Sequence, residues 1–164
     1  MTLSWDKFFI TMAYLVAMKS KDEATHCGSV IVGPDNEVIS VGYNSFVKGI
    51  NDSVPERQLR PEKYLWFEHG ERNAIYLAAR RGIPNGCRMY VTGLPCAPCA
   101  RAIIQCGIKK VIIKDRKSFG GPEKTWDDDH KATIQMFKEA EIDLQIFEGD
   151  FIREIYEFTR GEKY

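Results

Sequence analysis

The chain has 164 residues with 23 Lys+Arg and 23 Asp+Glu, so it lacks the basic excess typical of a broad nucleic-acid-binding surface. It is 44% hydrophobic and 28% charged, a globular balance, and its length suits a single domain over residues 1–164. No apolar run approaches the roughly 20 residues of a membrane span, and the first residues lack the layout of a secretory signal. We therefore expect a soluble, cytoplasmic protein.

The first part of the chain predicts a helix followed by a β-hairpin. Residues 4–19 carry apolar side chains at helical spacing, and Ser4 is placed to cap the N-terminus. Two β-branched runs, 27–33 and 38–44, are joined by the turn residues "PDNE" and indicate the strands of a hairpin. The polar stretch 45–63 follows, and a connection of this length is often functional.

The second part predicts alternating helices and strands. Periodicity and helix-stop residues indicate helices at 69–81, 95–107, 126–140 and 150–160. Short β-branched runs indicate strands at 88–92, 109–114 and 142–147. Such alternation favours parallel strand pairing with helices on both faces of the sheet, which is an α/β fold.

Cys96 and Cys99, in the run "LPCAPC", are the first residues that suggest chemistry. Because they are three apart at the start of a helix, both sulfurs lie on one face near an N-terminus whose partial positive charge favours thiolate. Thiolates together with imidazole suit Zn²⁺. Taken alone, however, C-x-x-C often belongs to structural zinc or to redox chemistry.

His69 is the natural third ligand, because the other two histidines have no companion at metal-ligand spacing. Three protein ligands leave one position for water, which is the catalytic arrangement of zinc. Glu71, two residues after His69, would diverge from it in mid-helix, so the two can face one site only at the start of a helix. A carboxylate beside an activated water can accept and pass on its proton. A lone H-x-E is usually a surface pair, but the order H-x-E, strand, P-C-x-x-C matches the zinc-deaminase signature.

The sequence resembles the cytidine/deoxycytidylate deaminase superfamily, most of all its dCMP deaminases. The matching segments are "SKD" at 20–22, "GYN" at 42–44, "HGERNAI" at 69–75, "MYVT" at 89–92, "PCAPCA" at 95–100 and "IIQCGIKKVI" at 103–112. The resemblance implies a three-layer α/β/α fold around a five-stranded mixed sheet. It also implies that His69, Cys96 and Cys99 bind one catalytic Zn²⁺, that Glu71 shuttles protons, and that Asn44 contacts the pyrimidine or sugar.

Some positions depart from the family pattern. Gly70 replaces the usual Ala between His and Glu, and it fits sterically. Ser45 and Val47 replace Gly and Pro in a segment that lies near the nucleotide in relatives. Arg72 stands where many relatives have Leu, so it either recognises an anion of the substrate or is a solvated helix-face side chain. The Cys and His that hold a second zinc in some relatives are absent from the long connection.

The resemblance implies hydrolytic deamination of a cytosine nucleotide, most simply dCMP to dUMP plus ammonia. Cations in or near the long connection are candidates for phosphate binding or for simple solvation: Lys48, Arg57, Arg60 and Lys63. A homo-oligomer and dCTP or dTTP effectors are also implied, with Arg80 near an effector or a subunit interface, unless it only complements the helix dipole. No membrane partner is expected.

Three alternatives remain open from the residues. A tRNA or single-strand nucleic-acid deaminase shares the signature but favours a basic surface, which the neutral charge balance opposes. A deaminase of free nucleosides, guanine or another heterocycle shares the same core, and Arg72 keeps this alternative open. A non-catalytic, zinc-stabilised binding module would have no use for Glu71.

Overall fold

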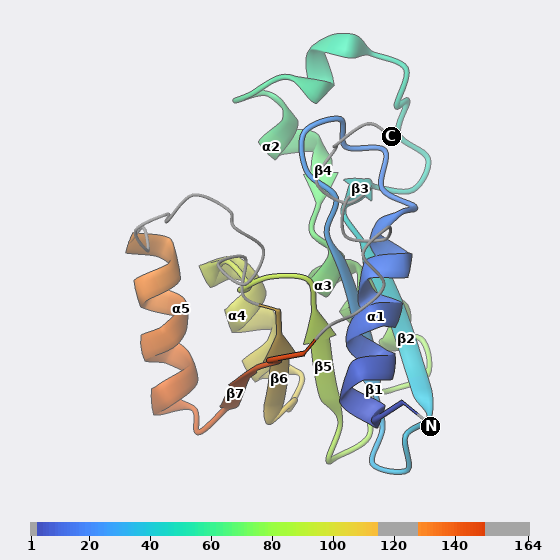
Figure 1. Cartoon of the computed structure of the whole chain (residues 1–164). Helices are drawn as coiled ribbons and strands as arrows, with labels where there is room; N and C mark the ends of the chain where they lie inside the picture. The colour runs from blue at the N-terminus through green and yellow to red at the C-terminus, as the bar shows by residue number, and fades with distance from the viewer. Residues whose placement is uncertain (1–2, 115–127, 150–164) are drawn as a thin grey trace.

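The computed structural model describes residues 3–114 and 128–149, built around one five-stranded sheet (Figure 1). The strand order is β2-β1-β5-β6-β7, antiparallel from β2 to β5 and parallel from β5 to β7. The strands are β1 (Gly28–Val32), β2 (Val38–Tyr43), β5 (Arg88–Val91), β6 (Lys110–Ile113) and β7 (Asp143–Ile146). The predicted hairpin and the parallel second half are both confirmed. The helix expected at 150–160 lies outside the described residues.

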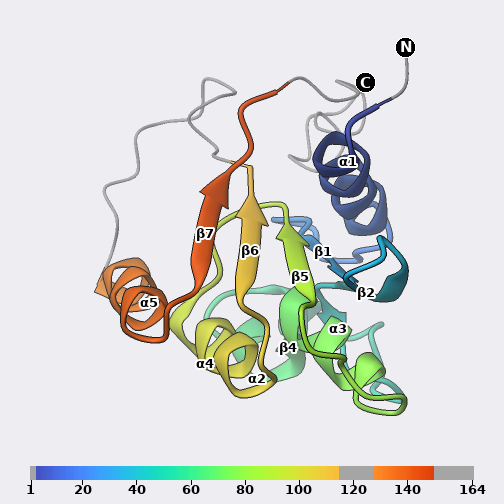
Figure 2. The ribbon, with the colours of Figure 1, turned by 90° about the horizontal axis from the view of Figure 1, so that it is seen from below.

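Helices cover both faces of this sheet. Figure 2 shows α1 (Trp5–Ala17) on one face and α3 (Gly70–Ala78), α4 (Ala97–Gln105) and α5 (Asp128–Glu139) on the other. The expected three-layer α/β/α architecture with a mixed sheet is therefore confirmed. Among the described residues, no helix is both long and apolar enough to cross a membrane.

Alternation along the strands explains the two layers of core. Val30 and Val32 of β1 pack with Phe9 and Ile10 of α1, whereas Ile31 between them belongs to the core beneath α3 and α4. Side chains of successive strand residues point to opposite faces, so a fully apolar strand requires cover on both sides. Each face of β1 is buried in this way.

The polar connection after β2 contains short elements that the sequence did not predict. β3 (Ser45–Phe46) pairs antiparallel with β4 (Phe67–Glu68), and the rings of Phe46 and Phe67 lie 4.3 Å apart. Between them lie a 3₁₀ turn, η1 (Pro55–Gln58), and one turn of helix, α2 (Lys63–Trp66). β4 leads directly into α3, so this small ribbon fixes the chain immediately before His69.

A glycine on β2 allows α3 to lie directly on the sheet. A Cβ atom at Gly42 would stand 2.1 Å from the carbonyl oxygen of Gly70 and 2.4 Å from the backbone nitrogen of Ala74. Any larger residue would push the first turn of α3 away from β2. α3 starts where expected but ends at Ala78, three residues earlier than the sequence predicted, in a turn closed by Gly82 at φ +89°.

Candidate active site

The first turns of α3 and α4 lie side by side and bring His69 and Cys96 together. His69 is the N-cap of α3, and Cys96 is the N-cap of α4. Both have extended backbones (ψ 154° and 165°), so each side chain projects from the end of its helix. Neither side chain makes a capping hydrogen bond to its own helix, which leaves the imidazole and the sulfur free to face each other.

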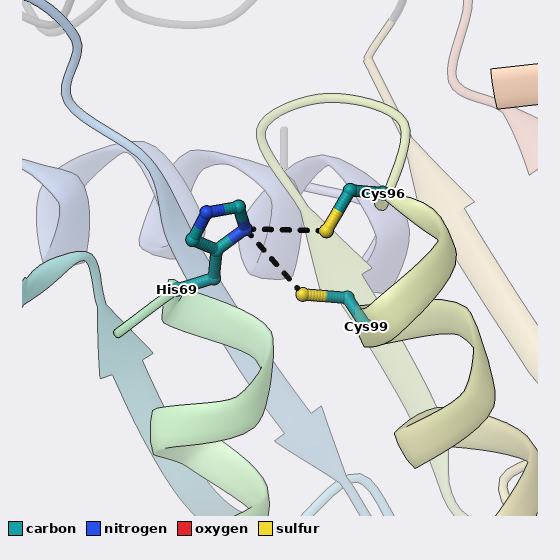
Figure 3. A group of neighbouring side chains, drawn as sticks. All are labelled: His69, Cys96 and Cys99. Atoms are coloured by element: carbon teal, nitrogen blue, oxygen red, sulfur yellow. Dashed lines mark hydrogen bonds between the residues drawn. The ribbon is translucent and has the colours of Figure 1, made fainter. Parts of the chain in front are cut away.

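His69, Cys96 and Cys99 form a compact group that fits a metal ion. Figure 3 shows the imidazole pointing at both sulfurs, with Nδ1 3.3 Å from Cys96 Sγ and 3.6 Å from Cys99 Sγ. Their ligand atoms all lie within 4.8 Å of one another, and no other metal-compatible group of three occurs in the described parts of the chain. One nitrogen and two sulfurs suit one Zn²⁺ and leave a fourth coordination position for water or substrate.

The electrostatics of this group favour a thiolate before any metal binds. The hydrogen bond from Cys99 and, to a smaller extent, the His69 imidazole together lower the pKa of the Cys96 thiol to about 4. The hydrogen bond to Cys96 raises the pKa of His69 in turn. A negative sulfur beside a positive imidazole results, and Zn²⁺ can replace the protons of this pair.

Glu71 occupies the first turn of α3 and is only 5% exposed. Burial raises the pKa of its carboxyl group, and the charge of His69 offsets part of this shift. The carboxyl group is also close enough to Cys96 for the thiolate to contribute. A buried carboxyl group with a raised pKa holds its proton more readily than an exposed one, which is a property that a proton shuttle requires.

Arg72 faces inward rather than outward. Its Nε donates to Glu68 Oε1 at 2.5 Å, a further nitrogen pairs with the same carboxylate, and Nη1 lies 3.5 Å from Cys99 Sγ. The Glu68 carboxylate also accepts a hydrogen bond from the backbone N–H of His69, at 3.0 Å. The solvated-face alternative is therefore wrong for Arg72, and an anion-binding role would compete with these two partners. Glu68 was missed, although its spacing of four from Arg72 is a helical ion-pair signal.

Asn44 is buried and ties the end of β2 to the segment 22–27 that precedes β1. Its Oδ1 accepts from the backbone N–H of Cys27 at 2.7 Å. Its Nδ2 donates to Asp22 Oδ2 at 3.0 Å and to the Thr25 carbonyl at 2.8 Å. Both amide protons are therefore engaged within the protein, and only a second lone pair on Oδ1 is left for a substrate.

Lys63 requires a correction, because the structure does not support phosphate binding by this residue. Its ammonium is buried and lies 2.7 and 2.6 Å from the two carboxylate oxygens of Asp22. The side chains of Lys63 and Asp22 are 6% and 5% exposed. A buried ammonium bonded to both oxygens of a buried carboxylate could reach an incoming phosphate only by giving up that pair. The pair instead ties α2 to the segment before β1.

The other candidate cations remain at the surface. Arg57 stacks on the Trp66 ring at 3.8 Å and donates to the Asn51 carbonyl, whereas Arg60 and Arg80 are exposed. Lys48 lines a pocket of about 220 Å³ together with Lys19 and Lys21, two cations that the sequence did not single out. Tyr43, Ser45, Phe46, Val47, Gly49, Ile50 and Asp52 complete its lining. This pocket contains none of the three metal-site residues.

Comparison with known proteins agrees with this geometry. Residues 3–115 match the family model described as "Cytidine and deoxycytidylate deaminase zinc-binding region". The deoxycytidylate deaminase of Mus musculus is 33% identical over 161 residues, which cover 95% of this chain and 86% of that protein. The deoxycytidylate deaminase of Homo sapiens is 38% identical over 128 residues, covering 75% and 71%.

A solved structure shares the fold. The dCMP deaminase of cyanophage S-TIM5, in complex with dCMP and dUMP, superimposes with a TM-score of 0.68 at 18% identity, covering 90% of this chain and 99% of that one. At this identity the likeness concerns the arrangement of helices and strands. The family match extends over most of the sequence and includes all three residues of the metal group, so this chain belongs to the cytidine and deoxycytidylate deaminase family.

Proposed function

We propose that this protein catalyses the hydrolytic deamination of a cytosine nucleotide, converting dCMP and water to dUMP and ammonia. The observation that carries the proposal is the meeting of His69, Cys96 and Cys99 at the starts of two helices, with the buried Glu71 in the same first turn. A structural zinc site normally has four protein ligands and no use for a buried acid beside it. The similarity to proteins named deoxycytidylate deaminase supports dCMP as the substrate.

The roles follow from what each side chain can do. His69, Cys96 and Cys99 would hold the ion, which when bound supplies the Lewis acidity that makes water nucleophilic near neutral pH. Glu71 accepts a proton from that water and delivers it to N3 of the ring as the oxygen adds to C4. A second proton, taken from the hydroxyl group added at C4 and delivered to the exocyclic amine, lets ammonia leave as the C4–N bond breaks, and the C4 carbonyl of dUMP remains. The raised pKa of Glu71 suits both transfers.

Substrate contacts are proposed for Asn44 and for three surface cations. Asn44 Oδ1 keeps one lone pair that can accept from the base or sugar. The 5′-phosphate needs cationic donors, and Lys48, Arg57 and Arg60 are the ones available in the connection between β3 and α2. Lys63 and Arg72 are not proposed as phosphate ligands. Lys63 is paired with Asp22, and Arg72 contacts Glu68 and Cys99.

The lysine-lined pocket supports a separate proposal of nucleotide effectors. Lys19, Lys21 and Lys48 line this pocket of about 220 Å³, and their positive charges would suit a polyphosphate such as that of dCTP or dTTP. Asp52, also in the lining, pairs with Lys21. Arg80, exposed just after α3, is a further candidate for an effector or subunit contact.

The remaining proposals concern the whole protein. We infer that residues 1–164 form one deaminase domain acting on nucleotides in the cytoplasm. A homo-oligomer is supported by the apolar side chains that α1 leaves exposed, among them Trp5 (57%), Phe8 (40%) and Leu15 (55%). Size-exclusion chromatography with light scattering, compared between native protein and Trp5→Ser, measures this directly.

A substrate panel tests the central proposal. Ammonia release is measured with dCMP, dCTP, deoxycytidine, cytosine, guanine and a tRNA anticodon stem-loop at equal concentrations. The expected result is the highest kcat/KM for dCMP, with deoxycytidine well below it because it lacks the phosphate. Turnover of guanine or the stem-loop in preference to dCMP would replace the proposed substrate. Release from none of them, by protein containing one zinc per chain, would overturn the deaminase assignment.

A further inference from the structure

α5 makes two hydrogen bonds to the chain segment that carries Cys96. Thr133 Oγ1 donates to the carbonyl oxygen of Pro95 at 3.0 Å, and Asp129 Oδ2 accepts from the backbone N–H of Ala97 at 2.9 Å. Pro95 and Ala97 are the two chain neighbours of Cys96. Asp129 and Thr133 are four residues apart and so lie on one face of α5, which Figure 2 shows alongside α4.

The bond from Asp129 supplies an acceptor for the first backbone N–H of α4, that of Ala97. The first backbone N–H groups of a helix have no partner within the helix, and the N-cap side chain usually accepts from one of them. Cys96 is the N-cap of α4, but its sulfur is directed toward His69 and makes no cap bond. The carboxylate of Asp129 comes from a different helix and adds negative charge at an end where the helix dipole favours it.

The bond from Thr133 fixes the other side of Cys96. Thr133 is 0% exposed, and its hydroxyl would be costly to bury without a partner. Phe137, one further turn along α5, is 1% exposed in the core shared with α4, so α5 is firmly seated where these bonds form. With the Pro95 carbonyl and the Ala97 N–H both held, the peptide planes on either side of Cys96 cannot rotate freely, and the direction of its Cα–Cβ bond is set.

We propose that Asp129 and Thr133 are positioning residues, which hold Cys96 in the orientation needed to bind the metal. This rests on the metal site of the proposed function, but not on the identity of the substrate. Side chains that orient a metal ligand without touching the metal commonly change metal affinity or activity by about 10- to 100-fold when they are removed. If the two bonds served only to attach α5, their loss would lower stability and leave the metal centre unchanged.

The test measures the metal centre itself. Zinc affinity is determined by competition with a chromophoric chelator for the native protein, Thr133→Val, Asp129→Ala and Asp129→Asn. Absorption spectra of the same proteins loaded with Co²⁺ in place of zinc report the cobalt–thiolate geometry. Thr11→Val is the matched control, because Thr11 Oγ1 also donates to a backbone carbonyl, that of Lys7 at 2.7 Å, but on α1 across the sheet.

We expect Thr133→Val and Asp129→Ala to bind zinc at least about 10-fold more weakly and to alter the cobalt–thiolate bands. Asp129→Asn keeps an oxygen acceptor, so its affinity should lie closer to that of the native protein. Thr11→Val should change neither measurement. Native affinity and spectra in both Thr133→Val and Asp129→Ala would overturn the proposal. If Thr133→Val does not fold, Asp129→Ala decides alone, because Asp129 is exposed and its loss leaves no cavity. A native protein without zinc would instead refute the proposed function.

Discussion

The guanidinium of Arg72 lies against the sulfur of Cys99, with 3.5 Å between Nη1 and Sγ. Glu68 holds the guanidinium in this position from the other side, since its carboxylate pairs with two nitrogens of Arg72. Positive charge is thus directed toward the sulfur of Cys99, which we propose as one of the zinc ligands. Because Arg72 contacts Cys99 and Glu68, kinetics can distinguish whether it acts on the metal centre or binds the substrate.

Arg72→Leu should lower kcat for dCMP by about 10-fold or more while leaving KM for dCMP nearly unchanged, because the lost contact is to the sulfur. Steady-state kinetics with metal analysis of each preparation provide the measurement. Arg101→Leu is a suitable control, since Arg101 is an exposed arginine on α4. A large rise in KM with native kcat would assign Arg72 to an anion of the substrate instead.

Lys63 and Lys48 should behave oppositely on substitution. Lys63→Met leaves the buried carboxylate of Asp22 without its ammonium, and breaking such a pair typically costs about 3–5 kcal/mol of stability. Lys48→Met removes an exposed cation, so stability should hardly change, whereas KM for dCMP should rise if Lys48 binds its phosphate. Urea unfolding and steady-state kinetics of both variants give the comparison. Native stability of Lys63→Met would show that this buried pair contributes little.

Tyr90 should give the protein a stability that disappears at high pH. Burial, together with the hydrogen bond that its hydroxyl donates to Asp6 at 2.6 Å, raises the pKa of Tyr90 to about 12 from its ordinary value of 10. The neutral phenol is favoured by folding, so its contribution is fully present below pH 10 and is lost as the pH rises toward 12. Tyr90→Phe should be less stable at pH 8 and lose less stability between pH 8 and 11.

The measurement is the urea midpoint of the native protein and Tyr90→Phe at both pH values. Tyr64→Phe serves as the control, because Tyr64 is 62% exposed and its substitution should follow the native pH dependence. Parallel pH profiles for the native protein and Tyr90→Phe would mean that the Asp6 bond does not stabilise the neutral phenol.

Local patterns were sufficient for most of the fold and for the metal group. Helical and strand periods are properties of contiguous residues, so α1, the hairpin and the parallel strands were predictable. His69 and Glu71 could be assigned to a helix start because two residues apart they would diverge in mid-helix. Cys96 and Cys99 could be paired for a different reason, because residues three apart lie on one face of a helix. The two-residue strands β3 and β4 were not predictable, because a period of two needs more residues to be recognised.

The other features that the sequence did not predict are contacts between residues far apart in the chain. A lysine in a polar connection is normally solvated, and nothing near Lys63 in the sequence identifies Asp22, 41 residues away, as its buried partner. The bond of Thr133 to Pro95 spans 38 residues and that of Asp129 to Ala97 spans 32. Such contacts depend on how α5 packs on α4, which follows from the core as a whole and not from any local motif.

Glu71→Gln offers the sharpest test of the proposed mechanism. Glutamine has nearly the same volume and can hydrogen-bond to water, but it cannot accept and deliver a proton at neutral pH. The ligand side chains His69, Cys96 and Cys99 are unchanged, so the variant should fold, retain one zinc per chain and bind dCMP. Turnover should fall by about 10² to 10⁴, and chiefly in kcat, because proton transfer matters most in the transition state.

Zinc analysis, dCMP binding by calorimetry and single-turnover kinetics separate the possible outcomes for Glu71→Gln. Loss of zinc would mean that Glu71 supports the metal ligands, which its 5% exposure and its charge coupling to His69 and Cys96 would allow. Full activity with bound zinc would show that the proton moves through another group, and the buried carboxyl would then have no catalytic role. A proton shuttle predicts that Glu71→Gln keeps its zinc and its affinity for dCMP but has a lower kcat. This combination shows that Glu71 makes its essential interaction in the transition state and not before it.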